Sequence, residues 1–288
     1  MEKKIKEPAP EQQQNAFKEH MDYLRRSPNN FSYWFPHVVR LHRQGLSIPK
    51  TVVIAVPEEV YKSFFLENEG DRQRIEGWVR ETVMPEIKRI PYLNSRKIFI
   101  KNGCYSGKFS FASGCLIPDS SDMQQLIRNI TNIENEAAMF ETGGDLELVL
   151  REYIEPRPDT PTIYNGMPLR PELRVFFDFD NRKILYAVNY WDWDYCHDRI
   201  CSGWNGERTP DADVYEWNYP CLAEETERLK NKHLSTIWSA LSQVTTLTMP
   251  DGRRNIWSVD FMLEEDKVWL IDMAQGWWSA YWNPDLIK

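Results

Sequence analysis

The order of the expected helices and strands predicts an α+β fold with two lobes for this 288-residue chain. Up to residue 101, helical regions and short strands follow one another. After a further helix, the chain continues as a mostly antiparallel set of strands with one long helix laid into it. Strands and helices do not alternate regularly and no internal repeat is visible, so we do not expect a doubly wound parallel sheet.

Apolar spacing defines the N-terminal elements. Residues 1–10 are polar and contain two prolines, and we expect a disordered leader there. Apolar residues at helical spacing predict a helix from Gln12 to Arg26. The β-branched run TVVIAV at 51–56 predicts a short buried strand, the charged stretch 57–89 predicts two helices, and KIFIK at 97–101 predicts a second strand.

The middle of the chain begins with a segment typical of a mobile loop. Residues 102–114 contain three glycines, three serines and one lysine. Helical spacing returns at 121–140, and an extended run follows at 146–154. Two alternating runs at 172–179 and 183–191 predict a β-hairpin around a short acidic turn.

The C-terminal part combines an aromatic segment, a helix and a final hairpin. Residues 192–221 are rich in Trp, Tyr, Asp and Gly, and we expect a loop-like region. A helix is expected at about 223–246, followed by a strand pair at 255–263 and 267–273. The closing run WWSAYW at 277–282 is expected to pack back on the β structure.

Composition excludes several classes of protein. No stretch approaches the roughly 18 apolar residues of a membrane helix, and the N-terminus lacks the apolar segment of a signal peptide, so we expect a cytoplasmic protein without membrane contact. The 35 basic and 43 acidic residues give a formal net charge of −8, which argues against broad nucleic-acid binding. The net charge does not exclude selective binding of RNA by a local basic patch.

The five cysteines are an odd, scattered set and do not predict a disulfide framework. Cys196 and Cys201 flank His197, which invites a zinc site. A zinc site needs about four ligands, however, and only Cys221 follows nearby, while the five histidines show no ligand spacing. Plain thiols are the favoured interpretation, with zinc as the alternative.

The final hairpin, SVDFMLEEDKVWLIDMAQG, carries two carboxylates. Asp260 and Asp272 fall on neighbouring strands, near the same end of the hairpin. An ionised carboxylate buried in an apolar strand costs several kcal/mol unless it is paired or bound to a metal. Two converging carboxylates suit Mg²⁺, which also takes phosphate oxygens. The alternative is a pair of solvent-facing carboxylates.

Cationic residues precede these carboxylates in the sequence. Lys101 ends an apolar strand just before the glycine- and serine-rich loop that carries Lys108, and flexible amides beside an ammonium suit phosphate binding. The loop matches neither GxxxxGK[ST] nor GxGxxG, so an ordinary surface loop is the alternative. Arg151 and Arg174 lie within strands, where each must point into a polar cleft or pair with a carboxylate such as Glu152 or Glu172.

Taken in order, these pieces resemble the ATP-grasp fold, and more narrowly the divergent clade that includes the cell division cycle protein 123 family. The resembling segments, spread over about residues 30–280, are LVLREYIEP at 148–156, ELRVFFD at 172–178 and DKVWLIDMAQG at 266–276. IPKT at 48–51 and IFIKNGCYSGK at 98–108 match more weakly.

The resemblance implies two lobes with a nucleotide cleft between them. It divides the chain into four regions. These are an N-terminal leader and helix (1–28), a region preceding the lobes (29–95), a small lobe with the glycine-rich loop (96–150) and a large lobe with the metal-binding hairpin (151–288).

The resemblance also implies roles for single residues. Lys101 and Lys108 would hold the phosphates of ATP, and Arg174 would reach the phosphates or the transferred phosphoryl group, which makes Arg174 and Lys108 the catalytic candidates. Asp260 and Asp272 would bind Mg²⁺. Backbone groups of an interlobe hinge would hold adenine; the hinge residues are Arg151, Glu152, Tyr153 and Ile154.

One position departs from the family pattern. ATP-grasp proteins usually place an Asn two residues after the second metal carboxylate, and this chain has Ala274 there, followed by Gln275. Alanine cannot ligate a metal, so either Gln275 substitutes or one ion is held less tightly. Full catalytic competence is thereby put in doubt, whereas nucleotide binding is not.

The function implied is an ATP-dependent carboxylate–amine ligase acting through an acyl phosphate on a peptide or protein. The alternatives are an ATP-dependent assembly factor for a protein complex, as in the cell division cycle protein 123 family, and a nucleotide-binding scaffold without turnover. We also hypothesise that Trp191, Asp192 and Asp194 help to form the second-substrate pocket, with aromatic packing as the alternative.

Overall fold

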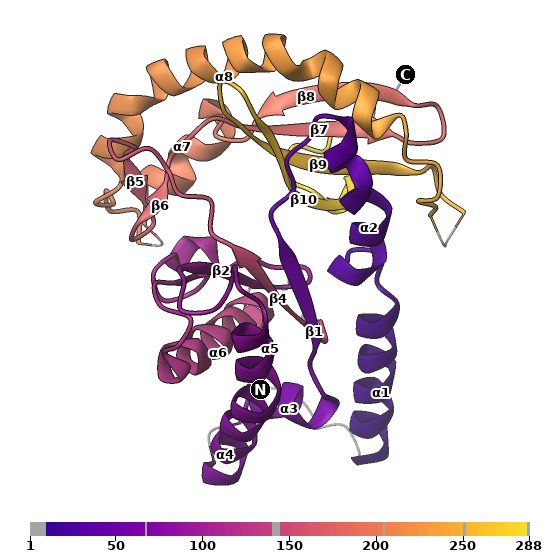
Figure 1. Ribbon diagram of the computed structural model, residues 1–288, viewed down its shortest axis with the longest axis vertical. Helices are drawn as coiled ribbons and strands as arrows, with labels where there is room; N and C mark the ends of the chain where they lie inside the picture. The colour runs from indigo at the N-terminus through magenta and orange to yellow at the C-terminus, as the bar shows by residue number, and fades with distance from the viewer. Residues whose placement is uncertain (1–9, 67, 140–144, 204, 250–251, 287–288) are drawn as a thin grey trace, which may run out of the picture.

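The computed structural model describes residues 10–66, 68–139, 145–203, 205–249 and 252–286. The expected leader therefore lies outside the described residues except for Pro10, which begins the first helix. Phe140, at the end of an expected helix, and Trp204, in the expected loop, also lie outside the described residues. Figure 1 shows two lobes, each built around a β-sheet.

The first lobe is a four-stranded antiparallel sheet in the order β1-β4-β2-β3, with helices packed on one of its faces. Its strands are β1 (Thr51–Ala55), β2 (Ile98–Asn102), β3 (Leu116–Ile117) and β4 (Glu147–Glu152). Its helices are α3 (Glu58–Ser63), α4 (Glu69–Trp78), α5 (Met84–Arg89) and α6 (Met123–Met139), with a π-helical turn (Val79–Val83) joining α4 to α5.

The second lobe is a four-stranded antiparallel sheet in the order β10-β9-β7-β8, crossed by one long helix (Figure 1). Its strands are β7 (Glu172–Asp178), β8 (Lys183–Asn189), β9 (Ile256–Leu263) and β10 (Val268–Gln275). Its helices are α7 (Trp193–Cys201) and α8 (Ala212–Leu241), and short 3-10 turns follow at Gly276–Trp278 and Pro284–Leu286. A two-stranded hairpin, β5 (Thr162–Ile163) and β6 (Met167–Pro168), lies on the connection between the lobes.

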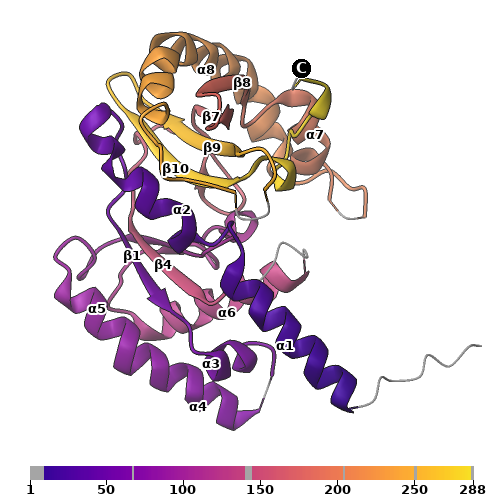
Figure 2. The same ribbon diagram turned by 90° about the vertical axis from the view of Figure 1, so that its right-hand side faces the viewer.

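The N-terminal segment contacts both lobes. Helix α1 (Pro10–Arg26) packs Met21 and Leu24 into the core of the first lobe. Helix α2 (Phe31–Val38) and the 3-10 turn Val39–Gln44 pack on the core of the second lobe, as Figure 2 shows. Strand β1 then returns to the first lobe and pairs with β4. The 29–95 region is therefore not a separate unit in space.

The predicted α+β fold with two lobes is confirmed, and most expected elements are found close to their predicted bounds. The expectation of a buried strand at 51–56 was only partly right. Strand β1 is an edge strand, because β4 alone pairs with it among the described strands, and Ile54 is its one buried residue. Among the described residues, no helix is both long and apolar enough to cross a membrane.

The prediction of a loop at 192–221 was wrong. Helix α7 begins there because the Asp192 carboxylate accepts a hydrogen bond from the Tyr195 N–H and so caps the helix. Helix α8 starts already at Ala212 and continues through Pro220. Some of the aromatic residues that suggested a loop pack between the two helices: the Trp193 ring lies 5.8 Å from that of Tyr215 and 5.0 Å from that of Tyr219, whereas Trp217 is exposed.

We predict that Asp192→Ala lowers the free energy of unfolding by about 1 kcal/mol, because the first turn of α7 loses its side-chain cap. Asp194→Ala, at an exposed position of the same turn, is the matched control and should cost less. Urea unfolding of both variants measures the difference. Equal losses would contradict a capping role for Asp192.

Candidate functional site

One face of each sheet is turned toward the other lobe. In the first lobe, Lys101 of β2 pairs with Val149, and Phe99 pairs with Arg151 of β4. Cross-strand partners share a face of the sheet, so these side chains lie together, whereas Ile98, Ile100 and their neighbours pack against the helices on the opposite face. The alternation of these strands therefore presents two cations to the second lobe.

A β-bulge at Ile271 determines the direction in which the Asp272 side chain points. Leu270 pairs with Phe261 and the next register pair is Asp272 with Asp260, so two residues of β10 oppose one residue of β9. In an unbroken register Asp272 would oppose Val259, whose side chain lies in the hydrophobic core. The bulge turns the Asp272 carboxylate to the side of Asp260 and so brings both acids into the cleft.

Both carboxylates form ion pairs with the predicted cations. Asp260 accepts bidentate bonds from Arg174, 2.7 Å from Nε and 2.7 Å from Nη2. Asp272 Oδ2 lies 2.7 Å from the buried Nζ of Lys101, which joins the two lobes. Asp260 thereby holds the pKa of Arg174 above its ordinary value, although burial alone would lower it.

The expected pairing of each arginine with a glutamate of its own strand is not found. Arg174 faces Asp260 directly across the β7–β9 register, so it pairs there and not with Glu172. Arg151 and Glu152 are adjacent on a strand and therefore point to opposite faces. Glu152 instead accepts a bond from the Lys50 N–H at 2.8 Å.

Arg151 is buried and only partly satisfied. Its Nε donates to Thr51 Oγ1 at 3.2 Å, and its Nη1 donates to the carbonyl oxygen of the bulge residue Ile271. The buried Nη2 has no hydrogen-bond partner among the described residues. Burial lowers the pKa of Arg151 to about 10, against the attraction of Asp272, so the guanidinium is still charged at neutral pH. A buried N–H donor without an acceptor costs free energy of folding, so an anionic ligand that accepts a hydrogen bond from Nη2 would stabilise the site.

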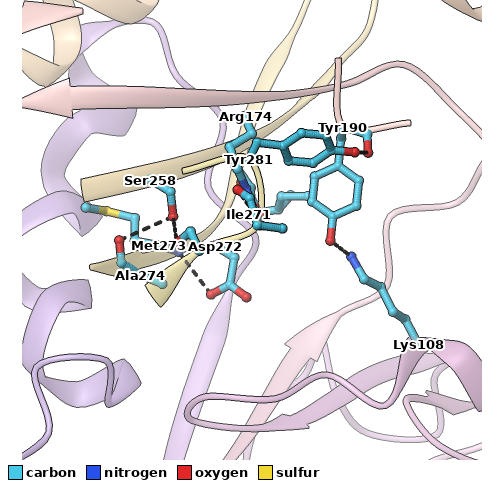
Figure 3. Close-up of polar contacts among 12 residues, drawn as sticks. Lys108, Arg174, Tyr190, Ser258, Ile271, Asp272, Met273, Ala274 and Tyr281 are labelled. Carbon is cyan, nitrogen blue, oxygen red and sulfur yellow. Dashed lines mark hydrogen bonds and ion pairs between the residues drawn. The ribbon is translucent and has the colours of Figure 1, made fainter. Parts of the chain in front are cut away.

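The glycine-rich loop brings Lys108 across the cleft. Gly107 takes a left-handed conformation with φ of +59°, directly before the short 3-10 turn Lys108–Ser110. Figure 3 shows the Lys108 ammonium reaching the hydroxyl of Tyr190 in the second lobe. Burial disfavours the ammonium, but Tyr190 and Glu172 together hold the pKa of Lys108 above its ordinary value.

Two adjoining pockets open between the lobes, and they share Ser106, Lys108, Asp260 and Asp272. The first pocket contains the end of β4 and the connection to the second lobe. The second opens toward α1 and the chain after β10. Of the predicted residues, those lining the first pocket are Lys101, Lys108, Arg151, Glu152, Tyr153, Ile154, Asp260 and Asp272, and those lining the second include Lys108, Arg174, Asp260, Asp272 and Ala274.

Gln275 is placed away from this site. Its side chain is buried on the opposite face of β10, where its Nε2 lies 2.9 Å from the sulfur of Met249. Residues 272 and 275 are three positions apart on a strand, so their side chains point to opposite faces. Gln275 therefore does not substitute for the Asn that the family pattern expects, and Ala274 faces the cleft in its place.

Trp191, Asp192 and Asp194 line neither cleft pocket. Trp191 is buried in a third hydrophobic cluster, Asp192 caps α7, and Asp194 is exposed. The Trp191 ring does lie near the cleft, with Lys108 Nζ 5.9 Å from its centroid, and a role of this segment in the second-substrate pocket stays a prediction.

Two charged residues of the first pocket, Arg170 and Glu172, were not assigned to the site from the sequence. Arg170 donates through Nη1 to the Ile154 carbonyl at 3.1 Å, while its buried Nε has no partner among the described residues. Glu172 is buried in the first pocket, and burial raises its pKa although Lys108 lowers it. The spacing of Arg170, Glu172 and Arg174 at every second position was a usable signal, because alternation places Glu172 and Arg174 on one face of β7 and Arg170 lies two residues before Glu172.

A buried acidic cluster supports the start of the glycine-rich loop. A Cβ on Gly103 would lie 2.1 Å from Asp145 Oδ2 and 2.6 Å from Glu147 Oε2, so only glycine fits there. Asp145 accepts a bond from the Gly103 N–H, yet its Oδ2 is buried without a partner among the described residues. Burial, and then the charge of Glu147, raises the pKa of Asp145 to about 7.

Comparison with known proteins finds likeness in solved structures. C-terminally truncated Cdc123 from Schizosaccharomyces pombe is 15% identical over 86% of this chain and 83% of that chain, with a TM-score of 0.43. D-alanine–D-alanine ligase from Bacillus anthracis complexed with ATP is 11% identical over 86% and 53%, with a TM-score of 0.32. The macrocyclase MdnC bound with precursor peptide MdnA from Microcystis aeruginosa MRC is 12% identical over 99% and 72%, with a TM-score of 0.34.

Cdc123, a D-alanine–D-alanine ligase and a macrocyclase are thus among the solved structures to which this chain is similar. No protein-family model and no curated protein matches the chain. At these identities and TM-scores the likeness assigns no function, and the function proposed below rests on the residues of the cleft.

We predict that the free energy of unfolding falls between pH 5 and pH 8. A carboxyl whose native pKa of about 7 exceeds its ordinary 3.8 binds its proton more tightly in the native state, so its contribution is complete below about pH 4 and lost as the pH rises through 7. Asp145→Asn should remove a slope of at most about 1.4 kcal/mol per pH unit. Chemical unfolding at several pH values measures it.

The matched control is Asp119→Asn. Asp119 is exposed and its pKa is lowered by bonds from Ser121, so this change should leave the slope between pH 5 and pH 8 intact. An identical slope in wild type and Asp145→Asn would contradict the buried, proton-binding carboxyl.

Proposed function

We propose that the cleft binds ATP with Mg²⁺ and that the chain is an ATP-dependent carboxylate–amine ligase acting on a peptide or protein substrate. The observation that carries this proposal is the position of Asp260, Asp272 and Lys108, which line both pockets. A phosphoryl group held by these side chains can be reached from a nucleotide on one side and from an acceptor on the other.

The first pocket fits a nucleotide. Its wall includes Phe99, Phe111, Tyr153, Ile154 and Met167, an apolar surface suited to a flat base such as adenine. The backbone at the end of β4 borders this wall, as expected for a hinge.

The charged end of the same pocket suits the phosphates. Lys101, Lys108 and Arg151 all reach it, and the unpaired Nη2 of Arg151 offers a donor that no protein group satisfies among the described residues. The nearby Nε of Arg170 is likewise unpaired there. Arginine and lysine donors in a partly buried pocket are the groups that bind phosphate oxygens.

The carboxylates fit Mg²⁺. This ion is usually held by one or two carboxylates together with substrate phosphates, and it neutralises charge on the phosphates when bound. Asp260 and Asp272 are at present paired with Arg174 and Lys101. Binding of the metal and nucleotide would let each carboxylate turn to the ion and each cation turn to a phosphate, so that no charge is left alone in the cleft.

The reaction proposed begins when a carboxylate oxygen of the acceptor attacks the γ-phosphorus of ATP. The bond to the bridging oxygen breaks, ADP leaves, and an acyl phosphate forms. An amine then displaces inorganic phosphate and gives an amide. Arg174 and Lys108 would neutralise the transferring group, and the protein supplies position and charge rather than a nucleophile of its own.

A second candidate function is an ATP-dependent assembly factor for a protein complex. Ala274 favours it, because this residue faces the cleft where the family pattern expects a metal-binding Asn. A cleft with two metal carboxylates and no third oxygen ligand at that position suits nucleotide binding with little turnover.

We predict that ATP with Mg²⁺ raises Tm by roughly 5–10 °C when the nucleotide is a hundredfold above its Kd. The increase should fall strongly in Lys101→Ala and in Asp272→Ala, because each removes a contact to the phosphates or the metal. Thermal unfolding with and without nucleotide measures it. Lys183→Ala and Asp266→Ala, both at exposed positions of the second lobe, are the controls and should keep the full increase.

The products distinguish the two candidate functions. ADP release that depends on an added peptide and amine selects the ligase. Stabilisation by ATP without release of ADP selects the assembly factor. No stabilisation of the wild type by any nucleotide would contradict both.

A further inference from the structure

Outside the cleft, metal-binding side chains converge between α7 and α8. Within the described part of the chain, His197, Cys201 and Glu216 are the group whose ligand atoms, one from each side chain, all lie within 4.8 Å of one another. His197 and Cys201 are one helical turn apart on α7 and share a face, and Glu216 comes from α8. None of the three lines either cleft pocket.

The contacts around this cluster match those of a metal site. His197 Nε2 lies 3.0 Å from Glu216 Oε1, while its Nδ1 lies 3.2 Å from Asp198 Oδ1. Metal-binding histidines almost always direct their second nitrogen to a carboxylate, carbonyl or water in this way. Arg208 holds Glu216 from the other side, with Nη2 2.6 Å from Oε2 and Nη1 3.0 Å from Oε1.

We propose that His197 Nε2, Cys201 Sγ and Glu216 Oε1 bind one Zn²⁺ ion, with a fourth position open to water. Imidazole, thiolate and carboxylate are the ligands that zinc takes in proteins. At ordinary zinc bond lengths the ligand atoms of a tetrahedral site are about 3.4–3.6 Å apart. His197 Nε2 and Glu216 Oε1, now 3.0 Å apart, would therefore separate slightly, and the most distant pair, within 4.8 Å at present, would approach by up to about 1 Å.

On binding, the Cys201 thiol proton goes to solvent, as does a proton on His197 Nε2 where the ring is an imidazolium, and the bonds to sulfur and to the deprotonated Nε2 form. His197 keeps its Nδ1 proton, which faces Asp198. The ion pair of Glu216 with Arg208 is retained on Oε2, while the bond from Arg208 Nη1 to Oε1 gives way to the metal. The alternative is that the cluster binds no ion and that His197 and Arg208 remain the ion-pair partners of Glu216.

Of the four residues from which the sequence suggested a zinc site, His197 and Cys201 belong to this ligand set, and Cys196 and Cys221 do not. The Cys196 thiol donates to the Tyr190 carbonyl oxygen at 3.5 Å and lies on the other side of α7. Cys221 is exposed on α8 and lines a separate surface pocket. Glu216 takes their place, and it could not be found while its segment was expected to be a loop.

The ion would clamp α7 onto α8 and so fix a wall of the cleft. Helix α7 carries Tyr195, whose ring lies 4.2 Å from that of Tyr281. Tyr281 in turn donates to the Tyr190 carbonyl at 2.6 Å, and Tyr190 receives Lys108. The metal would therefore support the residue against which the glycine-rich loop closes.

The experiment titrates the metal-free full chain with Co²⁺, which occupies zinc sites and absorbs by charge transfer when a thiolate is bound. We expect this absorption to saturate at one equivalent and to disappear when Zn²⁺ is added. Cys201→Ser should abolish it, and His197→Gln should weaken Co²⁺ binding at least as much as Asp198→Asn. Asp198→Asn, at a side chain 98% exposed, should weaken it roughly ten- to a hundredfold.

Cys221→Ser and Asp272→Ala are the matched controls and should keep the full absorption, since neither residue belongs to the cluster. Absence of the charge-transfer absorption in the wild type would overturn the proposal. So would its persistence in Cys201→Ser or its loss in Cys221→Ser. If Cys201→Ser does not fold, the exposed Asp198→Asn decides, because unchanged Co²⁺ affinity there contradicts the site.

Discussion

The extra residue at Ile271 is the constraint on which the cleft depends. It interrupts the register of β9 and β10, so Asp272 points to the cleft beside Asp260 and not into the core. The carbonyl oxygen of Ile271 accepts a bond from Arg151 of the first lobe, so the bulge also holds a cation at the pocket. A single irregularity in one strand thus positions the two carboxylates and the guanidinium that we assign to one ligand.

The contacts that join the lobes are made by the same groups that we assign to the nucleotide. Lys101 reaches Asp272, Lys108 reaches Tyr190, and Arg151 reaches the bulge. Removing one partner of a buried ion pair costs several kcal/mol unless another charge replaces it. A ligand that brings both phosphates and a cation satisfies every group at once, so nucleotide binding and the closure of the lobes are coupled in this account.

The sequence was most informative where the alternation of side chains along a strand determines which face a residue lies on. Lys101, Arg151 and Arg174 lie on strands whose other face is apolar, which made a polar cleft predictable. The hairpin in the sequence predicted that Asp260 and Asp272 lie close together. The β-bulge that brings them to the same face could not be predicted, because Ile271 is neither Gly nor Pro. The placement of Gln275 on the opposite face follows from alternation and could have been predicted.

Long-range packing could not be predicted in the same way. Helix α7 and the first turns of α8 are rich in aromatic residues and Asp, a composition that by itself favours a loop. Their helical state depends on a cap at Asp192 and on ring packing between residues more than 20 positions apart, such as Trp193 and Tyr215. The unpaired donors of Arg151 and Arg170 likewise depend on the meeting of two lobes.

The most direct measurement is a crystal structure of the chain with Mg²⁺ and a non-hydrolysable ATP analogue. The account predicts one ion about 2.1 Å from a carboxylate oxygen of Asp260 and one of Asp272, with the phosphates on Lys101 and Lys108. It also predicts that both carboxylates have left their present partners. An analogue bound outside the cleft, with the pairs Arg174–Asp260 and Lys101–Asp272 intact, would contradict it.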